Sequence, residues 1–170
     1  MHPAEDFLTR FPAFDFAVLA HGFPQHGRDY HIVIQHDSGT DSGTHEIAFT
    51  HCVRVDYETR VPDDVWHVSW ADVLTDYEEW KAAGYPAGHV WGTNWSNAYP
   101  GLKAIHDSEL ASEWTSRLGK EMFEITLQTG RFVLRLIFHA IVTRKVSDEV
   151  AIISQVSIPA GPPGPSGRLP

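Results

Sequence analysis

Alternating apolar and polar residues dominate the first third of the chain. The alternation is clearest through residues 45–57, where one face collects His45, Ile47, Phe49, His51, Val53, Val55 and Tyr57. A period of two residues is typical of a strand with one face in the core, so we expect one long strand here, or two shorter strands joined by a bulge. Residues 29–36 alternate in the same way, and residues 37–44 between the two segments predict a wide hairpin connection.

Two segments carry apolar residues at helical spacing instead. The first runs over residues 62–80 and begins with one Pro and two acids. It is either one helix or two helices separated by a break near Ser69. The second runs over residues 109–118, with Ser108 as the predicted N-cap and Gly119 as the predicted stop.

The rest of the chain predicts short strands separated by turns. Further strands are expected at 15–20, 89–95, 102–106, 123–127, 132–145 and 150–158. A turn is expected over 97–101, and residues 5–14 indicate a short helix or turn. Strands, then helices, then strands favour a single α+β domain over residues 1–158, a mainly antiparallel sheet with two or three helices packed on it. Residues 159–170 form a Gly/Pro-rich tail that we expect to be flexible.

Charge narrows the choice of partners. Lys and Arg number 13 against 22 Asp and Glu, so the formal net charge is −9. Nucleic-acid binders need a basic patch, and this balance argues against that class. An acidic surface could steer a basic protein partner into place, although acids also serve solubility alone. The 11 histidines predict a strong dependence of charge on pH.

Cellular location also follows from the sequence as an expectation. No stretch has the roughly 20 apolar residues of a membrane helix, and the first residues lack the features of a secretory signal. We therefore expect a cytoplasmic protein with no membrane association. Cys52 is the single cysteine, so no internal disulfide can form, and its place in a strand pattern favours a structural role. The sequence leaves the oligomeric state open.

Histidine spacing supplies the first candidate site. His21, His26 and His31 recur five residues apart, with Arg28 and Asp29 between them. These five residues are the candidate catalytic groups, and the three histidines are candidate ligands for a divalent metal. Glycines and a proline make this segment a loop, so the helical logic of metal-binding histidines does not apply. The alternatives are a structural polar loop, in which Arg28 pairs with an acid, and a loop that contacts a ligand or partner.

Aromatic and amide side chains supply a second candidate. Trp91, Asn94, Trp95 and Tyr99 suit stacking on a ligand or anchoring an interface. Together with Tyr30 they are the predicted binding residues. The alternative is a core strand whose tryptophans pack on the two helices.

Acidic and nucleophilic signatures are weaker. Asp72 and Asp76 are spaced to share one helix face, where they could bind a cation or act as acid and base, or simply form a solvated face. The sequence has no G-x-S-x-G elbow and no Gly-rich phosphate loop. His45 and His51 are expected at opposite ends of a core face, each with a hydrogen bond.

Four motifs occur in a recognisable order. They are His21-Gly22-Phe23 before Arg28-Asp29-Tyr30, Pro62-Asp63-Asp64-Val65-Trp66, Val90-Trp91-Gly92, and Tyr99-Pro100-Gly101. In this order the chain resembles the bacterial YxiG-like domain family over roughly residues 10–146. The resemblance implies a helix at the second motif, a strand at the third and a C-terminal β-hairpin. The Ser96-Asn97 insertion and the tail depart from the family pattern.

The resemblance carries no established activity. It implies proximity to genes of secreted toxins, and hence an immunity-like role. Two readings follow, and a structural subunit without either role is a third alternative. One is a protein- or ligand-binding module, such as an immunity-like inhibitor of a basic toxin. The other is a small enzyme or metal-binding protein that uses the His-rich loop 21–31.

Overall fold

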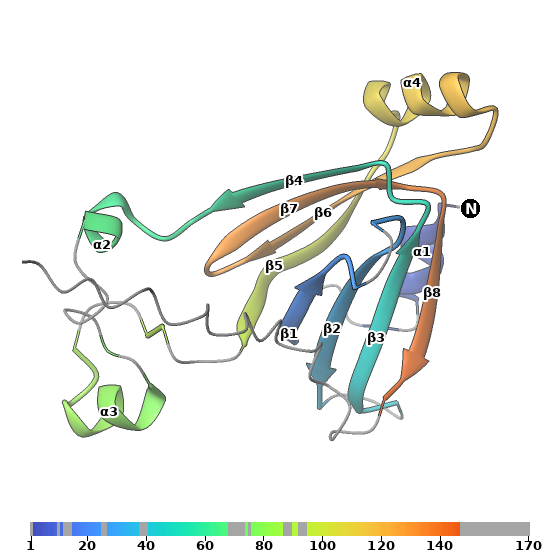
Figure 1. Ribbon diagram of the computed structural model, residues 1–170. Helices are drawn as coiled ribbons and strands as arrows, with labels where there is room; N and C mark the ends of the chain where they lie inside the picture. The colour runs from blue at the N-terminus through green and yellow to red at the C-terminus, as the bar shows by residue number, and fades with distance from the viewer. Residues whose placement is uncertain are drawn as a thin grey trace, which may run out of the picture.

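The computed structural model contains eight strands and four short helices in the part of the chain that it describes (Figure 1). That part is residues 2–9, 11, 15–24, 27–37, 41–67, 74, 76–86, 90–91 and 95–146. In chain order the elements are α1 (Pro3–Leu8), β1 (Ala17–Gly22), β2 (Tyr30–His36), β3 (Gly43–Thr50), β4 (Arg54–Thr59), α2 (Asp63–His67), α3 (Tyr77–Ala82), β5 (Ser96–Ile105), α4 (Glu109–Leu118), β6 (Phe123–Thr129), β7 (Phe132–Phe138) and β8 (Ala140–Lys145). The strand predicted at 150–158 and the tail lie outside the described residues.

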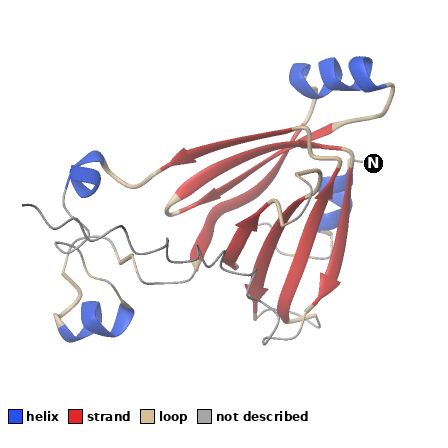
Figure 2. Ribbon diagram, viewed as in Figure 1, coloured by secondary structure: helices blue, strands red, loops and turns tan. Residues whose placement is uncertain are grey.

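The strands form one antiparallel sheet in the order β4-β7-β6-β5-β1-β2-β3-β8. β3 leads into β4 through residues 51–53, and β7 leads into β8 through His139. Because β3 pairs with β8 and β4 pairs with β7, the same two stretches of chain reach both ends of the sheet. The sheet therefore bends at these two connections, and Figure 2 shows its two halves running in different directions from the bend. The predicted α+β fold with an antiparallel sheet is confirmed.

Side chains from both halves of the sheet share one core. It contains Val18, Ile32, Ile34, Ile47 and Phe49 from one half, and Ile125, Leu127, Leu134, Leu136 and Phe138 from the other. Phe49 and Phe138 meet across the bend with ring centroids 5.0 Å apart. Each fully buried Leu, Ile or Phe side chain stabilises the fold by about 1.5–3 kcal/mol. Apolar burial between the halves therefore holds the sheet in its bent form.

α4 covers the outer side of the sheet near the bend. The Ser108 hydroxyl accepts a hydrogen bond from the Ala111 N–H, and Gly119 ends the helix in the left-handed conformation, as the sequence predicted. Trp114 of α4 and Val53 pack against the buried cluster of Ala111, Met122 and Ile137. In the part of the chain that is described, no helix is long and apolar enough to cross a membrane.

The segment 45–57 is two strands, which confirms the bulged alternative and not the single long strand. His51 has a φ of +50°, a left-handed conformation that interrupts an extended backbone. The interruption reverses the faces of residues 51 and 52 alone, because Val55 of β4 still packs against the core, as the alternation predicts. Cys52, predicted on the polar face, is therefore buried. His51 leaves the core face and becomes half-exposed.

Two further expectations are corrected, and the helical segment 62–80 is divided, an alternative that the sequence left open. Residues 97–101 do not form a turn, because β5 runs straight through them with a register shift against β6 between Ala98 and Gly101. Gly and Pro thus produce a bulge instead of a chain reversal. The return strand expected over 132–145 is divided into β7 and β8, which have different neighbours. The helical segment 62–80 contains the two short helices α2 and α3, and residues 68–73 between them lie outside the described residues.

Candidate functional site

The His-rich loop is divided between two faces of the sheet. His21 pairs in register with Ile32, a core residue, while Gly22 pairs with His31. Cross-strand partners lie on the same face and successive residues on opposite faces. His21 and His31 therefore point to opposite sides of the β1–β2 pair. They cannot share a ligand there.

His21 lies on the inner side, next to Tyr30. Its Nδ1 is 2.6 Å from the Tyr30 hydroxyl, and its ring centroid is 4.6 Å from that of Phe132. Burial lowers the pKa of His21 and raises that of Tyr30. We therefore assign the hydroxyl as donor to a neutral imidazole. Tyr30, one of the predicted binding residues, is buried, and its hydroxyl makes this hydrogen bond inside the protein.

His31 lies on the outer side, in a row of polar groups across three strands. Its Nδ1 is 2.6 Å from Glu46 Oε1, and the Arg144 guanidinium donates to the other carboxylate oxygen. Burial by itself raises the pKa of Glu46. The hydrogen bonds from Arg144 and His31 outweigh that effect and leave the pKa lowered. This row accounts for His31 as a cross-strand pairing group.

The metal hypothesis gains nothing from these positions. His26, the third histidine of this hypothesis, lies outside the described residues. Among the described residues, no three His, Cys, Asp or Glu side chains are placed to hold a metal ion.

Arg28 and Asp29 instead meet His51. The Asp29 carboxylate accepts a hydrogen bond of 2.8 Å from the His51 N–H, and the Arg28 guanidinium contacts His51 Nε2. Lys120, just after α4, approaches the same Nε2 to 3.5 Å. The expectation that Arg28 pairs with an acid is therefore wrong for the described residues.

A cavity of about 410 Å³ opens beside the side chains of Arg28, His51 and Lys120. It is lined by Gly27, Arg28, His51, Cys52, Val53, Leu118 and Lys120. We call it the Arg28–Lys120 cleft. Partial burial lowers the pKa of His51, and the nearby Arg28 and Lys120 charges lower it further. Burial raises the pKa of the Cys52 thiol to about 12, so this cysteine is not a thiolate near neutral pH.

Sequence reasoning missed Lys120 and misplaced His51. Lys120 is 69 residues from His51 in the chain and Arg28 is 23 residues from it. No local pattern links such positions. The one sequence signal is the polar residue His51 within an apolar alternation, a pattern that also suits a core histidine.

The tryptophan segment forms part of a second candidate site. Trp91 packs on Trp66 of α2 with ring centroids 5.3 Å apart. A cavity of about 260 Å³ between α3 and β5 includes Tyr77, Trp80 and Trp95. We define the aromatic surface as Trp66, Tyr77, Trp80, Tyr85, Trp91, Trp95 and Tyr99. Trp95 is 47% exposed and Tyr99, on the β5 bulge, is 70% exposed, while Asn94 lies outside the described residues.

Acidic residues adjoin this surface. The exposed side chains are Asp63 and Asp64 of α2, the α3 N-cap Asp76, and Glu78 and Glu79 of α3. The Asp76 carboxylate caps α3 by accepting a 2.6 Å hydrogen bond from the Glu79 N–H. Asp72 lies outside the described residues, so the proposed pairing of Asp72 with Asp76 stays a prediction.

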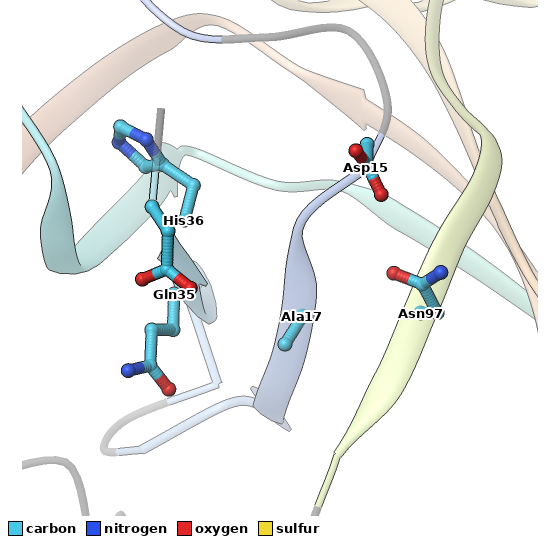
Figure 3. Close-up of a pocket in the computed structure, with 6 residues that line it drawn as sticks. Asp15, Ala17, Gln35, His36 and Asn97 are labelled. Carbon is cyan, nitrogen blue, oxygen red and sulfur yellow. The ribbon is translucent and has the colours of Figure 1, made fainter. Parts of the chain in front are cut away.

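A third cavity, of about 450 Å³, lies at the ends of β1 and β2. Figure 3 shows the Asp15 carboxylate and the Asn97 amide beside it, while the His36 ring turns away from both. That ring stacks on His45 with centroids 5.1 Å apart, and His45 Nε2 bonds to the Asp41 carbonyl. His45 thus confirms the expectation of a buried, hydrogen-bonded core histidine.

Comparison with known proteins gives a family and no activity. The sequence model of a family described as "YxiG-like protein" matches residues 5–155. A search of curated proteins finds no match. Among solved structures, an uncharacterized protein from Neisseria gonorrhoeae is similar at 7% identity with a TM-score of 0.37. The similarity covers 78% of this chain and 93% of that one.

Proposed function

The chain belongs to the YxiG-like protein family, and from that premise we propose that it is a binding module that takes a basic protein partner on its aromatic surface. The observation that carries the proposal is the exposure of Trp95 and Tyr99 beside acidic helices. Figure 1 shows α2 and α3 lying beyond the sheet, at the opposite end from α1 and α4. A partner can reach them there without disturbing the core.

Large exposed aromatic side chains are suited to anchoring a partner. Trp66, Tyr85, Trp95 and Tyr99 are each about half exposed or more. Trp and Tyr are enriched among the residues that carry most interface energy, because they bury much area at little cost in side-chain entropy. The cavity between α3 and β5 adds a hollow into which a partner side chain could insert.

The negative charge of α2 and α3 favours a positively charged partner. α2 and α3 present five exposed carboxylates, against Lys81 and His67 as basic side chains of the same helices. The whole chain carries −9. Complementary charge raises association rates and suppresses wrong partners more than it adds affinity. A lysine- or arginine-rich protein surface therefore fits best.

A basic toxin is one partner of this chemistry. The acidic helices and exposed aromatics are the features that an immunity-like inhibitor would use to cover such a toxin. Candidate toxins are the products of adjacent genes. Co-expression of this chain with its toxin would then restore the growth of cells that the toxin alone inhibits.

The first experiment compares three baits in the lysate of the source organism. They are the wild-type chain, the Trp95→Ala/Tyr99→Ala double variant, and Tyr57→Ala, which removes an exposed tyrosine from β4 instead. Proteins captured by the wild type and by Tyr57→Ala, but not by the double variant, are purified and their binding is measured. We expect the double variant to weaken binding about thirtyfold, the effect of losing a hot spot.

A salt series then tests the charge argument. Raising the ionic strength should slow association, while dissociation changes little. Neutralising Asp63 and Glu78 should slow it likewise, and neutralising Glu58 of β4 should not. Equal capture by the wild type and the double variant would refute the proposal.

A further inference from the structure

Two cations converge on one neutral acceptor at the Arg28–Lys120 cleft. The Arg28 guanidinium and the Lys120 ammonium group both approach His51 Nε2, from the β1–β2 connection and from the end of α4. An imidazole nitrogen offers one lone pair, while guanidinium and ammonium together bring eight N–H donors. Most of these donors therefore have no acceptor among the residues that the structure describes.

The two cations also lack an anionic partner among the described residues. Neither forms an ion pair there, whereas Arg54, Arg117, Arg135 and Arg144 each contact a carboxylate. The Asp29 carboxylate, next to Arg28 in the chain, accepts a hydrogen bond from the His51 N–H. A cationic cleft in a chain of net charge −9 is a local reversal of sign.

Apolar side chains line the rest of the cleft. Val53 and the buried Cys52 contribute from the β3–β4 connection, and Leu118 from α4 is 49% exposed. The volume of about 410 Å³ is within the usual range for small-molecule sites. An apolar surface beside unneutralised cations matches a ligand with one anionic end.

We propose that the Arg28–Lys120 cleft binds a small organic anion, with its carboxylate or phosphate group between the two cations and its apolar body against Val53 and Leu118. Arg28 supplies a planar fork of donors and Lys120 a point charge, a combination suited to either oxyanion. This site uses none of the residues of the aromatic surface.

His51 is the positioning residue of the cleft. Its backbone is held in the left-handed conformation by the hydrogen bond from its N–H to Asp29, and residues in this conformation are frequent at ligand sites. Its Nδ1 is shielded from solvent and has no hydrogen-bond partner among the described residues. Its ring lies 5.7 Å from that of His139. A bound anion would accept hydrogen bonds from the Arg28 and Lys120 groups that now contact His51 Nε2.

The test titrates phenylacetate, phenyl phosphate and the neutral 2-phenylethanol into the protein and follows backbone amide signals by NMR. Phenylacetate and phenyl phosphate should shift the amides of residues 27–28, 51–53 and 118–120, and the tighter of the two identifies the group preferred. Arg28→Gln and Lys120→Met should each weaken binding about tenfold, the effect of losing a hydrogen bond to a charged group. The Arg28 residue is exposed and Lys120 is half-buried, and thermal unfolding checks that both variants fold.

The matched control is Lys103→Met, which removes an exposed lysine of β5 outside the cleft. It should bind both anions as the wild type does. An equal loss of binding in Lys103→Met would mean that the net charge of the protein, and not the cleft, determines anion binding. That result would overturn the proposal. So would shifts of the same size with 2-phenylethanol, or anion-induced shifts confined to other parts of the chain.

Discussion

His21 Nδ1 and the Tyr30 hydroxyl are 2.6 Å apart across the β1–β2 pair, although nine residues separate them in the sequence. Stacking of the His21 ring with Tyr57 of β4 extends this contact to the other half of the sheet. The bond joins two residues that the sequence assigned to different roles, one as a catalytic or metal-binding candidate and one as a binding residue. Its burial gives both a structural role and leads to a measurable pH dependence.

Stability should fall as the pH drops through the titration range of histidine. Burial lowers the pKa of His21 below its ordinary value of 6.5, so below about pH 6.5 the unfolded chain binds a proton that the folded chain does not. The free energy of unfolding therefore decreases as the pH falls. His21→Asn keeps a side-chain acceptor without titrating, and should give a shallower slope between about pH 7.5 and 5.5.

Urea unfolding at several pH values measures this slope. His67→Asn is the control, since His67 is an exposed residue of α2. Identical slopes for the wild type and His21→Asn would contradict the assignment of a neutral, buried His21.

Glu124→Gln should destabilise the fold by about 1.5–3 kcal/mol, the contribution of a hydrogen bond to a charged group. Glu124 of β6 is 2% exposed, and its carboxylate accepts from Arg135 and from the Ser108 hydroxyl that caps α4. Glu58→Gln on β4 removes an exposed acid and should change stability by less than about 0.5 kcal/mol. Chemical denaturation measures the free energy of unfolding of both variants. Equal losses of stability would mean that the buried contacts of Glu124 do not contribute to stability.

Cys52 should be inert in the folded protein. Its thiol is buried and has a pKa raised to about 12, so the reactive thiolate is scarce near pH 8. A colorimetric disulfide reagent should react slowly with the native chain and rapidly once urea unfolds it. Rapid reaction under native conditions would show that the β3–β4 connection opens readily.

Phenylacetate binding at the Arg28–Lys120 cleft should strengthen as the pH falls from about 8 to 6, a range in which this carboxylate stays ionised. Partial burial lowers the pKa of His51, Arg28 and Lys120 lower it further, Asp29 raises it and His139 lowers it. A bound anion offsets the two cations and lets His51 take up a proton, so affinity and protonation rise together. His51→Asn tolerates the left-handed backbone and should bind with little pH dependence; an unchanged pH profile would count against His51 as a positioning residue.

The local elements of this fold were predictable because their signals are local. Ser108 and Gly119 delimit α4, and the alternation at 29–36 marks β2 with its buried face. The order of four motifs indicated the family. Failures came where one local signal supports two structures: the Pro100 and Gly101 pair suits a turn or a bulge, and pairing of β5 with β6 on both sides decided for the bulge.

The candidate sites depended on contacts that no local pattern encodes. The sequence supplied the exposed aromatic residues of the segment 91–99 and the histidines of loop 21–31, but it could not tell which of them would meet. Strand pairing sent His21 inward and His31 outward, and it left Arg28 and Asp29 beside His51.

By itself, the sequence determined the fold class, the faces of most strands and the acidic balance of the chain, because burial period, capping and charge are properties of neighbouring residues. The tertiary structure alone decided that Arg28, His51 and Lys120 share one cleft. Those residues come from three connections that meet where the sheet bends. The bend itself follows from burying both halves of the sheet against each other, which is a property of the whole core.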